Sequence, residues 1–391
     1  MRFSVVFGLA AVASAQSLTS LLAGDLSSLA GLITASPNVA SLLSNATNIT
    51  IFAPNNAAIS ALTSSSNFAA LNASGPNFIA NLLRYHVLVN RTVQASAISS
   101  TPLFPNTLLT NGNYTNVTNG QVVRVRNNGT NVNIQSGYKN SAQVVSSVNF
   151  TGGIVHVINS VLTIPANIST TASAAGLSAL AGALGLTNLS RTLDTLKDVT
   201  VFAPSNSAFA NIGSALGTLS AAQVSQILTY HVINGTIAYS ASLGNTSIPT
   251  LGGGRVNITV TPAGAVFVNQ ARVINADALV ANGVVHVLDS VLNPNGTAAP
   301  DFSATTAAIA YPGASSTSAL GALTSTLRTP TTTATALVTT GTAVASGYTT
   351  VRPAGGAAAT TTTSPGAAMP MATAALGAVA LGGWVALMGQ M

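Results

Sequence analysis

The sequence contains no cysteine and no glutamate among its 391 residues. The lack of cysteine excludes disulfides, thiol catalysis and thiolate-bound zinc, so apolar cores must hold the domains together. Only 5% of the residues are charged, with 12 lysines and arginines against six aspartates, which excludes helices supported by many ion pairs. The motifs G-x-S-x-G, G-x-x-x-x-G-K-[ST] and H-E-x-x-H are also absent. We expect neither a cofactor nor a metal.

The first 15 residues have the pattern of a secretory signal peptide. Arg2 supplies the positive charge, "FSVVFGLAAV" is a short apolar run, and Ala13-Ser14-Ala15 is a cleavage site of small residues. The apolar run is too short to span a bilayer. We therefore predict that residues 1–15 are removed, that the mature chain begins at Gln16, and that it is secreted.

The last residues predict attachment to a lipid. Residues 372–388, "ATAALGAVALGGWVALM", are apolar and follow the small residues of "PGAAMP", and no lysine or arginine follows Arg352. A single-span anchor usually has basic residues on its cytoplasmic side. A removable glycosylphosphatidylinositol (GPI) signal instead has small residues, a spacer and a short apolar tail. We predict such a signal at 366–391, with Gly366 as the attachment residue and Gly356 as the alternative.

Three blocks of sequence occur twice in the same order. "TIFAPNNAAI" (50–59) matches "TVFAPSNSAF" (200–209), "LLRYHVL" (82–88) matches "ILTYHVI" (227–233), and "GGIVHVINSVL" (152–162) matches "NGVVHVLDSVL" (282–292). The repeats predict two homologous domains, at 17–165 and 166–295. The first copy is longer by about 20 residues, chiefly around "TPLFPNTLLTNGNYTNVTNG" (101–120), which is typical of a loop insertion.

The pattern within each copy predicts an α+β domain. Leucines recur at helical spacing at the start of each copy, and the segments "NITIF" and "DVTVF" favour strands. Phe52 and Phe202 are expected in the core, while Asn56 and Asn206 are expected to cap the next helix or form a turn bond. Short strands with glycine turns follow, so they dominate the second half of each domain.

The composition changes after Asn295. Residues 296–365 contain 27 Ser and Thr among 70 residues, which predicts an extended O-glycosylated stalk that cannot fold compactly. The domains before it contain 14 Asn-x-Ser/Thr sequons, as expected for a surface glycoprotein. They are Asn45, Asn48, Asn72, Asn90, Asn113, Asn116, Asn128, Asn149, Asn167, Asn188, Asn234, Asn245, Asn257 and Asn295.

The repeated blocks resemble the fasciclin family, twice and in the right order, over about 280 of the 391 residues. The resemblance implies domains that combine a β-sandwich wedge with a group of helices. It also implies an extracellular, often lipid-anchored protein of adhesion or of the wall and matrix, here of fungal or plant type. Tyr85-His86 and Tyr230-His231 match the family's tyrosine-histidine segment. Asp277 matches an acidic position, but Ala278 replaces the isoleucine of integrin-type recognition.

All four histidines lie inside the repeated blocks, and they raise the question of catalysis. A catalytic or metal-binding hypothesis pairs His86 with His156 and His231 with His286. The mature first domain has a single carboxylate side chain, that of Asp25, which excludes a pair of acids for glycoside hydrolysis within it. The pattern "VHV" favours buried imidazoles that bond to the backbone. We therefore predict that the histidines are structural.

The charge is divided unevenly between the two copies. The first has a net charge of +4 in its mature part and the second a net charge of zero. Arg124 and Arg126 lie two residues apart on a predicted strand and so share a face. They are candidates for contact with an acidic glycan or phosphate-bearing polymer, or else solvated side chains on an edge strand. Without a basic cluster or aromatic platform, no nucleic-acid partner is expected.

Three functions are open at this point. The first is adhesion between cells, or association with wall or matrix polysaccharide or glycoprotein, by a lipid-anchored surface protein. A like molecule on another cell is the other candidate partner. The second is an extracellular carrier of a small apolar ligand or lipid, held between sheet and helices. The third and least favoured is a wall-remodelling enzyme, whose only acids would be Asp194, Asp198, Asp277 and Asp289.

Overall fold

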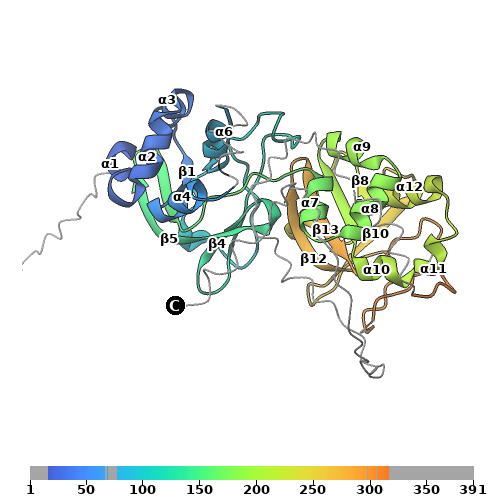
Figure 1. Ribbon diagram of the computed structural model, residues 1–391. Coiled ribbons are helices and arrows are strands. Elements are labelled where there is room, and N and C mark those ends of the chain that lie inside the picture. Colours follow the sequence, from blue (N-terminus) through green and yellow to red (C-terminus); the bar gives the residue numbers. More distant parts are fainter. Residues whose placement is uncertain (1–15, 67, 69–76, 297, 305, 317–391) are drawn as a thin grey trace, which may run out of the picture. The chain divides into compact units, whose positions relative to one another are not determined.

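The computed structural model describes residues 16–66, 68, 77–296, 298–304 and 306–316 (Figure 1). All described residues belong to one compact unit within Met1–Ala345, and Ser346–Met391 lie outside the described residues. The predicted signal peptide (1–15), the predicted lipid-attachment signal (366–391), Gly356 and the sequon at Asn72 also lie outside them.

The first domain begins with helices and ends with strands. Its α-helices are α1 (Leu18–Leu21), α2 (Ser27–Thr34), α3 (Pro37–Ser44), α4 (Asn56–Thr63) and α6 (Asn77–Tyr85). Its strands are β1 (Ile49–Pro54), β2 (Val87–Leu88), β3 (Arg124–Asn127), β4 (Val132–Gln135), β5 (Ser141–Phe150) and β6 (Gly153–Ile158), in the spatial order β2-β1-β6-β5-β4-β3. Among the described helices none alone is long and apolar enough to cross a membrane, and one bent pair, Gly24–Thr34 with Pro37–Ser44, passes only as a pair.

The second domain repeats this arrangement. Its helices are α7 (Ile168–Ala174), α8 (Ser178–Leu186), α9 (Leu189–Thr195), α10 (Asn206–Asn211), α11 (Gly213–Leu216) and α12 (Ala221–Tyr230). Its strands are β7 (Val199–Pro204), β8 (Val232–Ile233), β9 (Thr246–Pro249), β10 (Arg255–Val260), β11 (Val266–Val268), β12 (Ala271–Val280) and β13 (Gly283–Leu288), in the order β8-β7-β13-β12-β11-β10-β9. The predicted α+β class is confirmed.

The opening and closing blocks of each repeat form neighbouring central strands. β1 pairs in parallel with β6, and β7 with β13, so that Phe52 lies opposite His156 and Phe202 opposite His286. These central strands are buried on both faces, as their apolar sequences require. Both phenylalanines are at most 1% exposed, which confirms their prediction as core residues.

A glycine begins each closing strand because the neighbouring backbone approaches it closely. Gly153 has φ +153° and Gly283 has φ +154°. A Cβ atom at either position would lie 1.9 Å from a backbone oxygen, that of Ile49 or of Val199. No side chain can fit there, because the obstructing atom belongs to the paired central strand.

Asn56 and Asn206 do not cap the helices that follow the central strands, contrary to the expectation. The caps are the preceding residues, Asn55 and Ser205, whose backbones are extended. The side chain of each accepts from the backbone N–H three residues further along the chain. The amide of Asn56 instead donates to the Gly24 carbonyl at 2.9 Å and accepts from a backbone N–H at the start of α2. Asn206 makes the equivalent contacts with the start of α8. Each asparagine thus joins the first long helix to the end of the central strand.

The segment predicted as the beginning of the stalk contacts the second domain. Phe302 packs edge-on against Phe267, with ring centroids 5.2 Å apart. The Ser290 hydroxyl donates to the Ala308 carbonyl at 2.5 Å, and Ala310 is 7% exposed. The domain therefore extends beyond the predicted boundary at 295, because a few apolar residues among the serines and threonines suffice for local packing. The predicted stalk beyond residue 316 lies outside the described residues.

Candidate functional site

The two histidines of the tyrosine-histidine segments join the beginning of each domain to its end. The Nδ1 atom of His86 lies 2.7 Å from the Leu82 carbonyl, and its Nε2 accepts from the backbone N–H of Leu162 at 2.9 Å. His231 makes the same contacts with Ile227 and Leu292, at 2.7 and 2.8 Å. Because Nε2 accepts a hydrogen bond, the proton of each neutral ring is on Nδ1.

These two rings are held in the neutral form. His86 is 3% exposed and His231 is 2% exposed. Burial lowers the pKa of each from 6.5 to about 4, and the hydrogen bond to the helix carbonyl opposes this only in part. A second proton would also remove the acceptor for the backbone N–H. Neither ring is therefore suited to proton exchange near neutral pH.

The histidines of the closing strands have the opposite tautomer. The Nε2 atoms of His156 and His286 each lie 2.8 Å from a backbone carbonyl, and both rings stack on the phenylalanine of the neighbouring strand. Burial lowers the pKa of both. The Nδ1 of His156 lies 2.7 Å from the Ser147 hydroxyl, whereas that of His286 accepts weakly from the backbone N–H of Asp277 at 3.4 Å.

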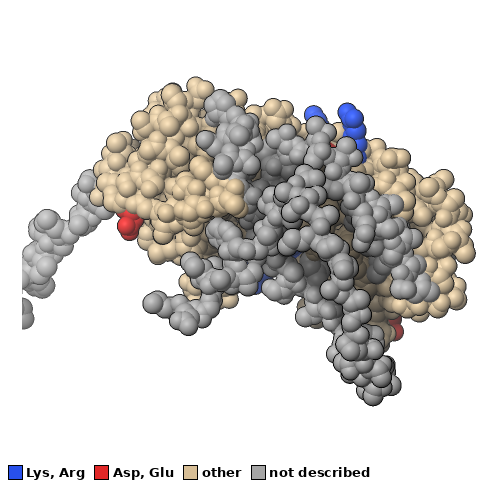
Figure 2. Space-filling view, viewed as in Figure 1, with Lys and Arg blue, Asp and Glu red and all other residues tan. Residues whose placement is uncertain are grey.

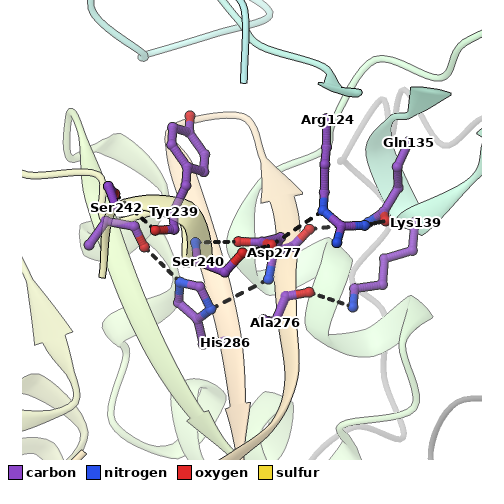
Figure 3. A network of polar contacts seen from close by, with 10 residues as sticks. Arg124, Gln135, Lys139, Tyr239, Ser240, Ser242, Ala276, Asp277 and His286 are labelled. Carbon is purple, nitrogen blue, oxygen red and sulfur yellow. Dashed lines mark hydrogen bonds and ion pairs between the residues drawn. The ribbon is translucent and has the colours of Figure 1, made fainter. Parts of the chain in front are cut away.

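Asp277 of the second domain stands at the centre of a polar network to which both domains contribute (Figure 3). It lies at an irregularity in the pairing of β12 with β13 and has φ +61°. Its carboxylate is fully buried and accepts from the backbone N–H and the hydroxyl of Ser240, at 2.8 and 2.5 Å. Arg124 of the first domain forms an ion pair with it, with 3.3 Å between Nε and Oδ2.

The first domain contributes three polar side chains to this junction (Figure 3). Arg124 donates from Nη1 to Gln135 at 2.8 Å, Gln135 donates to the Asp277 carbonyl at 3.2 Å, and Lys139 donates to the Ala276 carbonyl at 2.6 Å. The pKa of Lys139 falls from 10.5 to about 8, chiefly through burial and next through the charge of Arg124, while Asp277 opposes both. Two cations that are mostly withdrawn from solvent thus share one buried carboxylate.

The insertion of the first copy (101–120) completes this junction. Thr115 and Asn116 both donate to the Ala281 carbonyl, at 3.0 and 2.8 Å. Phe104 stacks on Tyr239, with ring centroids 4.2 Å apart and planes 10° from parallel. The sequence analysis predicted only a loop here. An insertion that is present in one repeat and absent from the other was nevertheless an indication that this segment makes a contact of its own.

A hollow of about 330 Å³ lies beside the junction, on the first domain. Its lining residues are Arg124, Arg126, Asn128, Asn133, Gln135 and Ser141. The two arginines share one face of β3, as the sequence analysis expected. Arg124 differs from a solvated edge residue, because Asp277 and Gln135 fix its guanidinium. Few charged side chains are visible on the face of the molecule drawn in Figure 2, in keeping with a chain of which only 5% of the residues are charged.

A sequence profile of the fasciclin domain matches residues 24–165 and 175–294. The two matches together cover more than half of the chain. This chain belongs to the fasciclin family. The resemblance seen in the repeated blocks is thereby confirmed, and the two α+β domains are tandem fasciclin domains.

Individual relatives of these fasciclin domains come from fungi and animals. The chain is 32% identical to a fasciclin-like arabinogalactan protein of Arthroderma benhamiae over 69% of its own length and 64% of that protein, which is under two thirds. It is 28% identical to fasciclin-like arabinogalactan protein CTB11 of Cercospora beticola, over 63% of the chain and 68% of that protein. A solved fasciclin domain pair from the insect cell adhesion molecule fasciclin I shares 19% identity at a TM-score of 0.34, covering 69% of this chain and 97% of that one.

The four acids of the second fasciclin domain are engaged separately. Asp194 accepts from Ser169, Asp289 accepts from the Arg272 backbone, and Asp198 accepts from Thr118 of the insertion. Among the described residues no group of three or more His or Asp side chains could hold a metal. The arrangement favours structural roles for these acids over the paired roles that an enzyme of glycoside hydrolysis needs.

The apolar space between sheet and helices is small in the second fasciclin domain. The cavity there, lined by residues that include Leu180, Phe202 and Leu228, has a volume of about 10 Å³. That is no more than a single water molecule requires. In this domain the side chains therefore fill the space between sheet and helices.

Most sequons of the fasciclin domains are accessible in the described part of the chain. The exposed ones are Asn45, Asn48, Asn90, Asn113, Asn128, Asn149, Asn188, Asn234, Asn245, Asn257 and Asn295. Asn116 and Asn167 are half-buried, and the backbone of Asn116 contacts the other domain. A glycan is therefore sterically simplest at the exposed positions.

Proposed function

We propose that this chain is a cell-surface glycoprotein that mediates cell adhesion or association with the cell wall or matrix. The observation that supports this function best is the open polar hollow beside the junction of two fasciclin domains. Arginines and amides line it, and they suit a hydrophilic polymer better than an apolar ligand. Binding of a polymer, and no turnover, is the activity that we assign to the chain.

The predicted ends of the chain complete the proposal. Removal of residues 1–15 would export the protein, and a GPI anchor at Gly366, or at Gly356, would hold it on the outer face of the plasma membrane. The Ser/Thr-rich stalk would then keep the domains away from the bilayer. Many tethered copies would supply the avidity that single weak contacts lack. The name of the fungal relatives, fasciclin-like arabinogalactan protein, agrees with a surface glycoprotein.

An adhesion assay on intact cells tests this function. Cells that display the full chain should clump or bind isolated wall material. Phosphatidylinositol-specific phospholipase C should release the chain and abolish that adhesion, because the lipid is the proposed attachment. Equal clumping by cells that lack the chain, or clumping that persists after the chain has been released, would contradict the proposal.

A further inference from the structure

We propose that the hollow on β3, β4 and β5 binds an acidic sugar of a polysaccharide or glycoprotein, with Arg126 as the principal contact. This inference rests on the proposed adhesive function and names the ligand class of its site. The shared chemistry is an anionic group on a sugar, whether carboxylate, sulfate or phosphate.

Strand register builds the hollow from alternate residues. Arg124 lies opposite Gln135 and Arg126 opposite Asn133, while Gln135 lies opposite Ser141 on the next strand. Side chains that alternate along a strand point to opposite faces. The intervening residues Val125, Ile134 and Ala142 are accordingly buried in the core of the first domain. The buried apolar face of the sheet thus fixes the positions of the polar side chains on the opposite face.

The charge of this face is not balanced within the described residues. Arg124 and Lys139 share the single carboxylate of Asp277, and Arg126 adds a third positive charge close to Arg124. Arg126 is exposed, and its guanidinium has neither a hydrogen bond nor an ion pair within the described part of the chain. Guanidinium groups bind carboxylate, sulfate and phosphate through paired hydrogen bonds.

The remaining lining residues suit the hydroxyl groups of a sugar. Asn133 and Gln135 offer amide donors and acceptors, and Ser141 offers a hydroxyl. The volume of about 330 Å³ equals that of roughly eleven water molecules, which is the scale of one or two sugar rings. The hollow therefore recognises a sugar unit within a polymer and leaves room for the polymer to continue outside.

The second domain provides an internal comparison. When the two sheets are aligned by strand register, Asn257 and Thr259 occupy the positions of the two arginines. On the same face, Phe267 packs against Phe302 from the segment that follows the domain. The second domain also has arginines on this face, but Arg255 donates to the Ser247 hydroxyl and the charge of Arg272 acts on Asp289. The exposed Arg126 of the first domain has no such partner among the described residues.

Asn128 makes this site sensitive to glycosylation. It lines the hollow and belongs to the sequon Asn-Gly-Thr. Its Oδ1 accepts from two backbone N–H groups of the following turn, which holds the side chain at the rim. A glycan on Asn128 would project beside the same opening that the ligand enters.

Binding of immobilised polysaccharides by the released full-length chain tests the inference. The probes are polygalacturonate, heparin and phosphomannan, with fully methyl-esterified polygalacturonate as the neutral control. All chains include Asn128→Gln, so that a glycan there does not cover the hollow. Arg126→Ser should weaken binding roughly ten- to hundredfold through loss of a charged hydrogen-bonding pair. Arg91→Ser removes the same charge from another exposed position of the first domain and should change binding less than twofold.

This experiment distinguishes a failure of the proposed ligand from a failure of the proposed adhesive function. The acidic polymer that depends on Arg126 identifies the anionic group. The inference would be overturned if Arg126→Ser caused no loss of binding, or if both arginine variants lost binding equally. It would also be overturned if the neutral ester bound as tightly as the acid, or if no acidic polymer bound. If cells still clump in a chain-dependent way under those results, the adhesive function stands without this ligand. If acidic polymers bind through Arg126 but adhesion does not depend on the chain, the site stands and the function fails.

Discussion

Gly283→Ala should destabilise the second fasciclin domain by about 2–5 kcal/mol. The new Cβ would meet the Val199 backbone oxygen at 1.9 Å, and the backbone at this position has a positive φ. The positive φ costs about 1–2 kcal/mol and overpacking about 1–3 kcal/mol, with no side chain that can move away to relieve the contact. This sum is a large part of the 5–15 kcal/mol that holds a typical domain folded. Urea unfolding of the secreted chain measures it.

Gly264 supplies the matched control for this substitution. Its φ is +81°, but no atom lies within 4 Å of the position where a Cβ would stand. Gly264→Ala should therefore cost only the backbone strain, about 1 kcal/mol. Gly153→Ala should reproduce the large effect in the first domain, since its Cβ would meet Ile49 at the same distance. Similar losses for Gly264→Ala and Gly283→Ala would show that the close approach of the two central strands does not constrain the fold.

Asp277→Asn should lower the free energy of unfolding by about 3–5 kcal/mol. Asparagine tolerates the left-handed backbone as aspartate does, so the change removes mainly the charge. Arg124 and Lys139 would then remain at the junction without their counter-charge, and breaking a buried pair costs this much. Chemical denaturation is run near pH 7 and again at lower pH, because loss of the Asp277 charge lowers the pKa of Lys139 below its value of about 8 in the parent chain.

Two further variants separate charge from other effects at the junction. Asp301→Ser removes an exposed aspartate outside the junction without creating an Asn-x-Ser/Thr sequon and should leave unfolding unchanged. Adding Arg124→Met and Lys139→Met to Asp277→Asn should restore much of the lost stability, because no unpaired cation would remain. A triple variant that is less stable than Asp277→Asn alone would contradict the view that the carboxylate acts by neutralising these cations.

The structural features that the two copies share could be predicted from the sequence. The repeated blocks predicted the paired domains and the buried Phe52 and Phe202, since these features follow from local pattern and duplication. The caps at Asn55 and Ser205 were missed by one residue, because whether an asparagine or the residue before it adopts the extended cap conformation depends on contacts with a distant helix.

The contacts that are present in only one copy could not be predicted from the sequence. Asp277 was visible as an acid without a counterpart, and Arg124 as one of two cations on a strand, but nothing in either pattern joins residues 153 positions apart. Pairing across two domains depends on how the insertion at 101–120 packs, which local propensity does not fix. The packing of Phe302 was missed because its surroundings have the composition of a disordered stalk.

Nitrogen-detected NMR of the histidine rings in the secreted chain tests most directly that the imidazoles hold the fold together and take no part in chemistry. We predict two rings with the proton on Nδ1, His86 and His231, and two with the proton on Nε2, His156 and His286. The pKa of all four should lie below 6.5, and those of His86 and His231 near 4, because burial lowers the pKa of each. Adding zinc should leave their signals unchanged. A ring that titrates near pH 6.5, or one that shifts with zinc while the protein stays folded, would contradict the account.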